Sequence, residues 1–243
     1  MKYTYQDVLQ SYPKNHQESL WSRIVARPVS FPISYIMANL GWTAWQASVL
    51  SIFVAILACV FMCFGYSLRW TGIVLSILWL VLDCVDGNVA RVTKTCSTMG
   101  DFIDAQSGYT IMAFIFFSNG VAAFNTSTML NREKAYFFII FGAISSISNI
   151  LARLLNAKYS YCELEKKVRN NDKIVFSSYD KPATTFTKIR VAADYHLGLV
   201  GLAMPFMIFS QIFNHYDWFT LFYCVYSISG FIAASVYYAL KAK

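Results

Sequence analysis

The chain has 243 residues, of which 57% are hydrophobic and 14% are charged, and its formal net charge is +7. Soluble domains contain roughly 45–50% apolar and about 25% charged residues. The composition therefore excludes a soluble globular protein and predicts an all-α integral membrane protein.

Residues 1–44 are expected to form a cytoplasmic or interfacial segment. Between residues 5 and 27, apolar and aromatic side chains mix with charged ones, which is typical of one or two amphipathic helices in the membrane interface. Trp21 would lie at the level of the lipid headgroups, and an ordered cytoplasmic segment without membrane contact is the alternative. Pro28 and Pro32 are expected to break this helix before the chain enters the membrane.

Residues 45–243 are expected to form a membrane domain of six helices. Apolar windows of about 20 residues, the length that crosses a bilayer, predict the spans. These lie near 46–66, 70–90, 100–122, 134–156, 191–213 and 217–239. Pro205 would kink the fifth span, and the polar stretch 158–189 would form a cytoplasmic loop. The predicted fold is a six-transmembrane-helix bundle preceded by an N-terminal amphipathic interfacial helix.

The distribution of basic residues predicts the orientation in the membrane. With the N-terminus in the cytoplasm, only Arg69, Arg132 and Lys134 of the 20 Lys and Arg residues fall on the opposite side. Both termini are therefore expected in the cytoplasm. The net positive charge then faces anionic lipid headgroups, so membrane lipids are expected as partners and nucleic acid is not.

The fourth and sixth spans each present a face of small and hydroxyl residues, within 142–149 and 227–235. Such faces let membrane helices approach closely. Tight packing within one bundle explains them, and the seam of a homodimer is the alternative.

Four aspartates follow the second apolar stretch: Asp83, Asp86, Asp101 and Asp104. An ionised carboxylate at membrane depth is costly unless something compensates it, so these acids indicate a functional site. Residues three apart on a helix project to the same side. If the second and third spans pack antiparallel, the carboxylates converge on one cytoplasmic pocket. Hard oxygen ligands with this charge indicate Mg²⁺ or Mn²⁺.

The spacing of these acids resembles the signature of the CDP-alcohol phosphatidyltransferase family, Asp-x2-Asp-Gly-x2-Ala-Arg-x8-Gly-x3-Asp-x3-Asp. The positions in register are Asp83, Asp86, Gly87, Ala90, Arg91, Gly100 and Asp104. The last aspartate of the signature is replaced by Gly108. The family often has Thr-Pro-Asn-x-x-Thr before the first span, and here only the flanking hydroxyls of Thr43 and Ser48 remain.

The resemblance implies an enzyme that displaces CMP from a CDP-linked alcohol. An acceptor alcohol would attack the β-phosphorus and form a phosphodiester, as in the synthesis of phospholipids and related glycan precursors. By position, Asp83, Asp86 and Asp104 would hold the metal ion. The CDP group would lie against Asp83, Gly87, Ala90, Arg91 and Gly100. Six spans in a chain of this length are nearer the compact microbial members, which places the protein in a microbial cytoplasmic membrane.

In the family the last aspartate helps to activate the acceptor hydroxyl, and Gly108 lacks the carboxylate to do so. Asp101, one turn before Asp104, takes over as base or as a further metal ligand in one explanation, which makes Asp101 and Asp104 the catalytic candidates. In a second, the base is Asp194, His196 or a metal-activated hydroxyl. In a third, the protein binds CDP or metal without turnover.

An acceptor alcohol needs anchors of its own, and Arg153 and Arg190 are the basic residues nearest the helix ends around the same cytoplasmic opening. They would suit a phosphate-bearing acceptor, although basic residues that contact lipid headgroups would have the same positions. A cation transporter is disfavoured, because its acids would lie deep in several spans rather than at one face. The identities of donor and acceptor are left open.

Overall fold

The computed structural model describes residues 2–13, 18–131, 133–170 and 185–242, which form helices with no β-strand among them. The N-terminal elements are α1 (Tyr5–Gln10), the π-helical turn η1 (Ser22–Ala26) and α2 (Arg27–Asn39). The later elements are α3 (Ala44–Met62), α4 (Tyr66–Thr93), α5 (Thr98–Thr126), α6 (Phe137–Arg169), α7 (Thr185–Leu197), η2 (Leu199–Ala203), α8 (Met204–Phe213) and α9 (Tyr216–Lys241).

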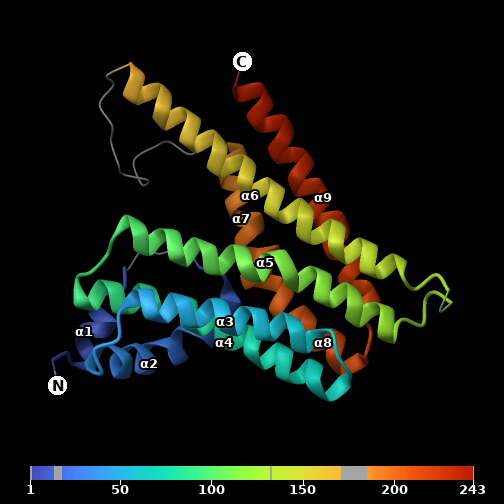
Figure 1. The fold of residues 1–243 in the computed structure, drawn as a ribbon, viewed down its shortest axis with the longest axis horizontal. Coiled ribbons are helices and arrows are strands. Elements are labelled where there is room, and N and C mark those ends of the chain that lie inside the picture. The colour runs from blue at the N-terminus through green and yellow to red at the C-terminus, as the bar shows by residue number, and fades with distance from the viewer. Residues whose placement is uncertain (1, 14–17, 132, 171–184, 243) are drawn as a thin grey trace.

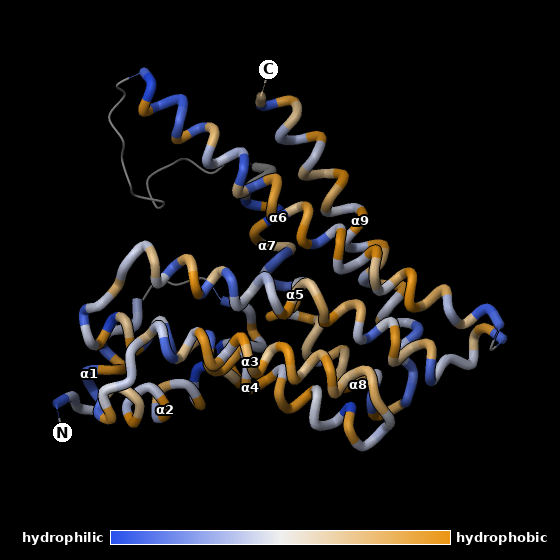
Figure 2. Tube along the Cα trace, in the orientation of Figure 1, coloured by the Kyte–Doolittle hydropathy of each residue, from blue (hydrophilic) through white to orange (hydrophobic). Residues whose placement is uncertain are grey.

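Six segments of the described chain are long and apolar enough to cross a membrane: α3, α4, α5, α6, α9 and the stretch Lys188–Phe213. Hydrophobic residues occupy the middle of these helices, and hydrophilic residues gather at the C-terminal end of α6 and near the turn between α5 and α6 (Figure 2). The predicted all-α, multi-pass membrane protein with six spans is confirmed.

Helix α3 is the central element of the half of the molecule that contains the acids. It packs against both α4 and α5, which have little contact with each other, while α2 packs on α4 (Figure 1). Helices α6 and α9 pack together and cross α5. The assumption that the second and third spans pack directly against each other is therefore wrong, because α3 lies against both of them.

Glycines bring the backbones of α5 and α6 into contact. A Cβ atom at Gly120 would lie 2.5 Å from the carbonyl oxygen of Phe138, and one at Gly142 would lie 2.7 Å from that of Phe116. Neither position has room for a side chain. Ser227 and Ala234 of α9 are also buried. Packing within one bundle thus explains the small-residue face of α6 and part of the face of α9, where Gly230 is exposed.

The prediction that Pro28 and Pro32 break the N-terminal helix is wrong, because α2 contains both of them. Pro28 lies in the first turn, where a helix needs no amide donor. Pro32 lies inside the helix, where the missing donor is costly. Packing of α2 on α4 offsets this cost, with Ser34 among the buried residues of α2.

The fifth span is interrupted rather than only kinked. Helix α7 ends at Leu197, the π-helical turn η2 follows, and α8 begins with Pro205 in its first turn. A Cβ atom at Gly198 would lie 2.2 Å from the carbonyl oxygen of Asp194, so this close approach requires glycine. The break therefore begins at Gly198, several residues before the expected proline.

Helix α6 extends well past the predicted end of the fourth span and includes part of the polar stretch 158–189. Its last turns contain Glu165, whose carboxylate accepts a 2.6 Å hydrogen bond from Arg169 four residues later. Such pairs support a helix outside the apolar region. Residues 185–189 belong to α7, and residues 171–184 lie outside the described part of the chain.

Candidate active site

A short turn places the two acid-bearing helix ends near each other. Helix α4 ends at Lys94, which adopts a left-handed conformation (φ 58°), and the Thr95 amide donates to the carbonyl of Ala90 over 2.9 Å. Ser97 then caps α5 by accepting a hydrogen bond from the Gly100 amide over 3.0 Å. The tight reversal keeps the C-terminal turns of α4 beside the first turns of α5.

Asp86 is buried and is held from two directions. Its Oδ2 accepts a 2.5 Å hydrogen bond from the hydroxyl of Ser48 in α3, and its Oδ1 accepts one of 2.5 Å from the Gly87 amide. With 4% of its surface exposed, Asp86 is far from bulk water. These donors stabilise a carboxylate at this depth and fix its orientation.

A second set of hydroxyl contacts joins α3, α4 and α5. The hydroxyls of Ser51 and Ser107 lie 2.6 Å apart, and the indole of Trp79 donates to Ser107 over 2.9 Å. All three side chains are buried. The sequence alone does not indicate these residues, because their hydrogen bonds depend on how the three helices pack together.

Asp83 and Asp104 interact directly across the space between α4 and α5. Asp104 also acts electrostatically on Asp86, and the exposed Asp101 acts on Asp104. Among the described residues, no ion pair neutralises these four acids. Within the described ranges, however, no three His, Cys, Asp or Glu side chains are grouped closely enough to hold a metal ion.

Of the residues predicted to contact CDP, four lie in the C-terminal part of α4 and Gly100 lies in the first turn of α5. The guanidinium group of Arg91 folds back over Gly87, where a Cβ atom would lie 3.1 Å from its Nη1. Its Nη2 donates to the Asn88 side chain over 2.7 Å, while its Nε is buried and has no hydrogen-bond partner among the described residues. Ala90 and Gly100 are partly buried nearby.

The N-terminal segment contributes to the site, which the sequence analysis did not predict. Glu18 forms an ion pair with Arg27, and it accepts a 2.5 Å hydrogen bond from the hydroxyl of Tyr12. Burial, together with this hydrogen bond to Glu18, raises the pKa of Tyr12 to about 12, so the phenol is a neutral donor near pH 7. The guanidinium group of Arg27 also lies 4.6 Å from the centre of the Tyr12 ring.

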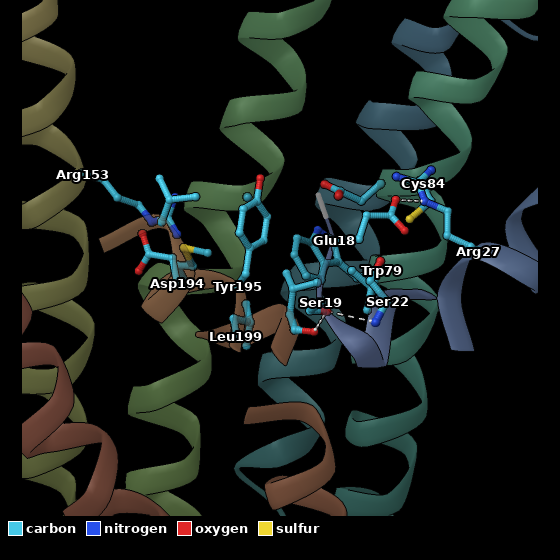
Figure 3. Close-up of a pocket in the computed structure, with 16 residues that line it drawn as sticks. Glu18, Ser19, Ser22, Arg27, Trp79, Cys84, Arg153, Asp194, Tyr195 and Leu199 are labelled. Atoms are coloured by element: carbon cyan, nitrogen blue, oxygen red, sulfur yellow. Dashed lines mark hydrogen bonds and ion pairs between the residues drawn. The ribbon is translucent and has the colours of Figure 1, made fainter. Parts of the chain in front are cut away.

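A cavity of about 370 Å³ opens beside these groups. Glu18 and Arg27 line one side and Arg153 and Asp194 another, so the N-terminal segment faces α6 and α7 across it (Figure 3). Asp83 and Gly108 also line it, so one acid of α4 and the position of the missing aspartate share one space.

Arg153 and Arg190 meet in a smaller adjoining pocket of about 90 Å³. Asp194 lines this pocket as well as the larger cavity, as does Arg153. The Nη1 of Arg190 donates to the hydroxyl of Tyr238 over 2.7 Å, and the Nε atoms of both arginines are buried with no hydrogen-bond partner in the described part of the chain. His196 is exposed and lines neither space.

A family model, CDP-alcohol phosphatidyltransferase, matches residues 43–226. This region includes all of α3 to α8 and the first part of α9, up to residue 226, and it leaves the N-terminal segment outside. A comparison with curated proteins finds no match. The match covers well over half of the chain and confirms the resemblance of the acidic motif. The chain therefore belongs to the CDP-alcohol phosphatidyltransferase family.

Proposed function

We propose that the protein is a metal-dependent CDP-alcohol phosphotransferase whose site faces the cytoplasm. Its family transfers phosphatidyl groups from CDP-linked alcohols. The observation that most supports activity in this chain is the interaction of Asp83 with Asp104 beside the buried Asp86. Carboxylates at membrane depth that form no ion pair with the described residues favour a ligand of opposite charge.

The donor chemistry of these residues fits Mg²⁺ or Mn²⁺. Asp83, Asp86 and Asp104 would hold the ion, with Asp101 as a further ligand, and the ion would draw together carboxylates that are not closely grouped without it. When bound, such an ion neutralises the pyrophosphate and stabilises the charge on the leaving CMP.

The chain's own residues would orient the donor. Asp86 is fixed by Ser48 and the Gly87 amide, so it presents a carboxylate of defined direction to the site. Arg91 would place its unpaired Nε against a phosphate, and Gly87 and Ala90 would leave room for the cytidine beside it. The acceptor would enter from the cavity lined by Arg153.

The test of this proposal is CMP release by purified protein in nanodiscs. Donors are CDP-diacylglycerol, CDP-choline, CDP-ethanolamine and CDP-glycerol, and acceptors are glycerol 3-phosphate, serine, myo-inositol and diacylglycerol. We expect one donor to give CMP in the presence of Mg²⁺ or Mn²⁺ and none after chelation with EDTA. Metal-dependent binding of CDP without release from any donor would instead indicate a binding protein that lacks turnover.

The two arginines make a phosphate-bearing acceptor the expected class. Hydrogen bonds to charged groups are worth about 1.5–3 kcal/mol each. We therefore expect Arg153→Gln to raise the KM of the acceptor roughly 10–100-fold while the KM of the donor stays unchanged.

Arg169→Gln is the matched control, because Arg169 is an exposed arginine at the end of the same helix. The measurement is an acceptor titration of CMP release, with glycerol 3-phosphate compared with glycerol. Equal use of the two acceptors, or an unchanged KM in Arg153→Gln, would contradict an anionic acceptor.

A further inference from the structure

The position of the missing aspartate is open space. Gly108 lines the cavity of about 370 Å³, and a Cβ atom built on it would meet no atom within 4 Å. Among the described residues, nothing obstructs the first atom of a side chain at this position. A base that replaces it must therefore reach the same cavity from another element.

Three carboxylates line this cavity: Glu18, Asp83 and Asp194. Glu18 is committed to Arg27 and to the Tyr12 hydroxyl, and only 9% of its side chain is exposed. Asp83 interacts with Asp104 in the proposed metal site. Asp101 is exposed in the first turn of α5 and does not line the cavity.

Asp194 takes part in neither the Glu18–Arg27 ion pair nor the Asp83–Asp104 interaction. Its contact is a 3.3 Å hydrogen bond from the hydroxyl of Tyr226, and the side chain is exposed. It also lines the pocket that contains Arg153 and Arg190. Asp194 therefore lies where the donor side and the acceptor side of the site meet, with Arg153 beside it (Figure 3).

The close approach at Gly198 contributes to this placement. The Gly198 amide donates to the carbonyl of Asp194 over 3.1 Å, and the interruption of the fifth span follows at once. Helix α7 thus ends one turn after Asp194, so Asp194 lines the cavity from the last turn of this helix. An uninterrupted helix would give the residue a different relation to α8 and the rest of the bundle.

We propose that Asp194 is the general base of the transfer, in place of the aspartate that the family signature has at position 108. This inference rests on the proposed function. The acceptor hydroxyl oxygen attacks the β-phosphorus of the CDP-alcohol, and its proton passes to the carboxylate of Asp194. The bond between the β-phosphorus and the bridging oxygen breaks, and the electron pair leaves with CMP.

The test compares Asp194→Asn with the wild-type protein in nanodiscs, using the donor and acceptor that the wild type turns over. General-base catalysis contributes about 10²–10⁴-fold, so we expect kcat to fall within that range while the KM of the acceptor and the binding of CDP stay unchanged. Because Gly108 has open space, Gly108→Asp added to Asp194→Asn should restore kcat at least about tenfold relative to Asp194→Asn.

Glu165→Gln is the matched control, because it removes an exposed carboxylate on the distal part of α6 and should leave kcat unchanged. Unchanged kcat in Asp194→Asn would overturn the inference and leave the proposed function standing. A raised acceptor KM with wild-type kcat would also overturn it, because it would make Asp194 a binding residue only. No CMP release by the wild type would overturn the proposed function and this inference together.

Discussion

Asp86→Ala is expected to lower CMP release by on the order of 10³-fold or more, because a buried and oriented acid of the proposed metal site is lost. The orientation of its carboxylate is fixed from α3 by Ser48 and from α4 by the Gly87 amide. The measurement is the initial rate of CMP release in nanodiscs at saturating Mg²⁺ or Mn²⁺.

Two serine variants serve as comparisons for the loss of activity in Asp86→Ala. Ser48→Ala keeps the carboxylate but removes one of its donors, and loss of such a supporting hydrogen bond costs roughly 10–100-fold. Ser76→Ala is the control. Ser76 is a buried serine in α4, the helix that carries Asp86, and its hydroxyl donates to the Gly72 carbonyl. Asp86→Ala with more than a tenth of wild-type activity would show that the carboxylate is not part of the catalytic site.

Gly120→Ala is expected to destabilise the protein, and to do so more than a glycine-to-alanine substitution at an exposed position. Its Cβ atom would lie 2.5 Å from the backbone oxygen of Phe138, so α5 and α6 would have to move apart. Overpacking of a well-packed interior costs about 1–3 kcal/mol. For a chain of this size we expect the melting temperature in detergent to fall by about 5 °C or more.

Gly230→Ala in α9 is the matched control, because a Cβ atom there would meet nothing within 4 Å. Alanine is also favoured over glycine inside a helix, so this variant should melt at or above the wild-type temperature. A Gly120→Ala protein with the wild-type melting temperature and elution profile would mean that α5 and α6 are not in backbone contact.

The hydropathy of the sequence predicted the six spans because membrane helices must be apolar over about 20 residues, whatever their neighbours. The acidic motif was also predictable from the sequence, since it lies within one helix end, a short turn and the start of the next helix. Interactions between residues that are far apart in the sequence could not be predicted in this way. The hydrogen bond from Ser48 to Asp86 joins residues 38 positions apart and depends on α3 lying between α4 and α5.

The N-terminal segment shows the same limit. Its mixed polarity predicted an interfacial helix, and the exposed side chains of Leu20 and Ile24 are compatible with lipid contact. The pairing of Glu18 with Arg27, which brings both residues to the cavity, has no signature in the spacing of the chain. The continuation of α2 through Pro32 could not be predicted from the sequence either, because packing on α4 outweighs the tendency of proline to break a helix.

The most direct test of the central claim is a mass balance of the transfer in nanodiscs. CMP and the new phosphodiester are both quantified by mass spectrometry from one CDP-alcohol and one acceptor, with Mg²⁺ or Mn²⁺ and with EDTA. We predict equal amounts of CMP and phosphodiester with metal and neither with EDTA. CMP without phosphodiester would indicate hydrolysis rather than transfer, and the absence of both, with CDP still bound, would contradict an active phosphotransferase.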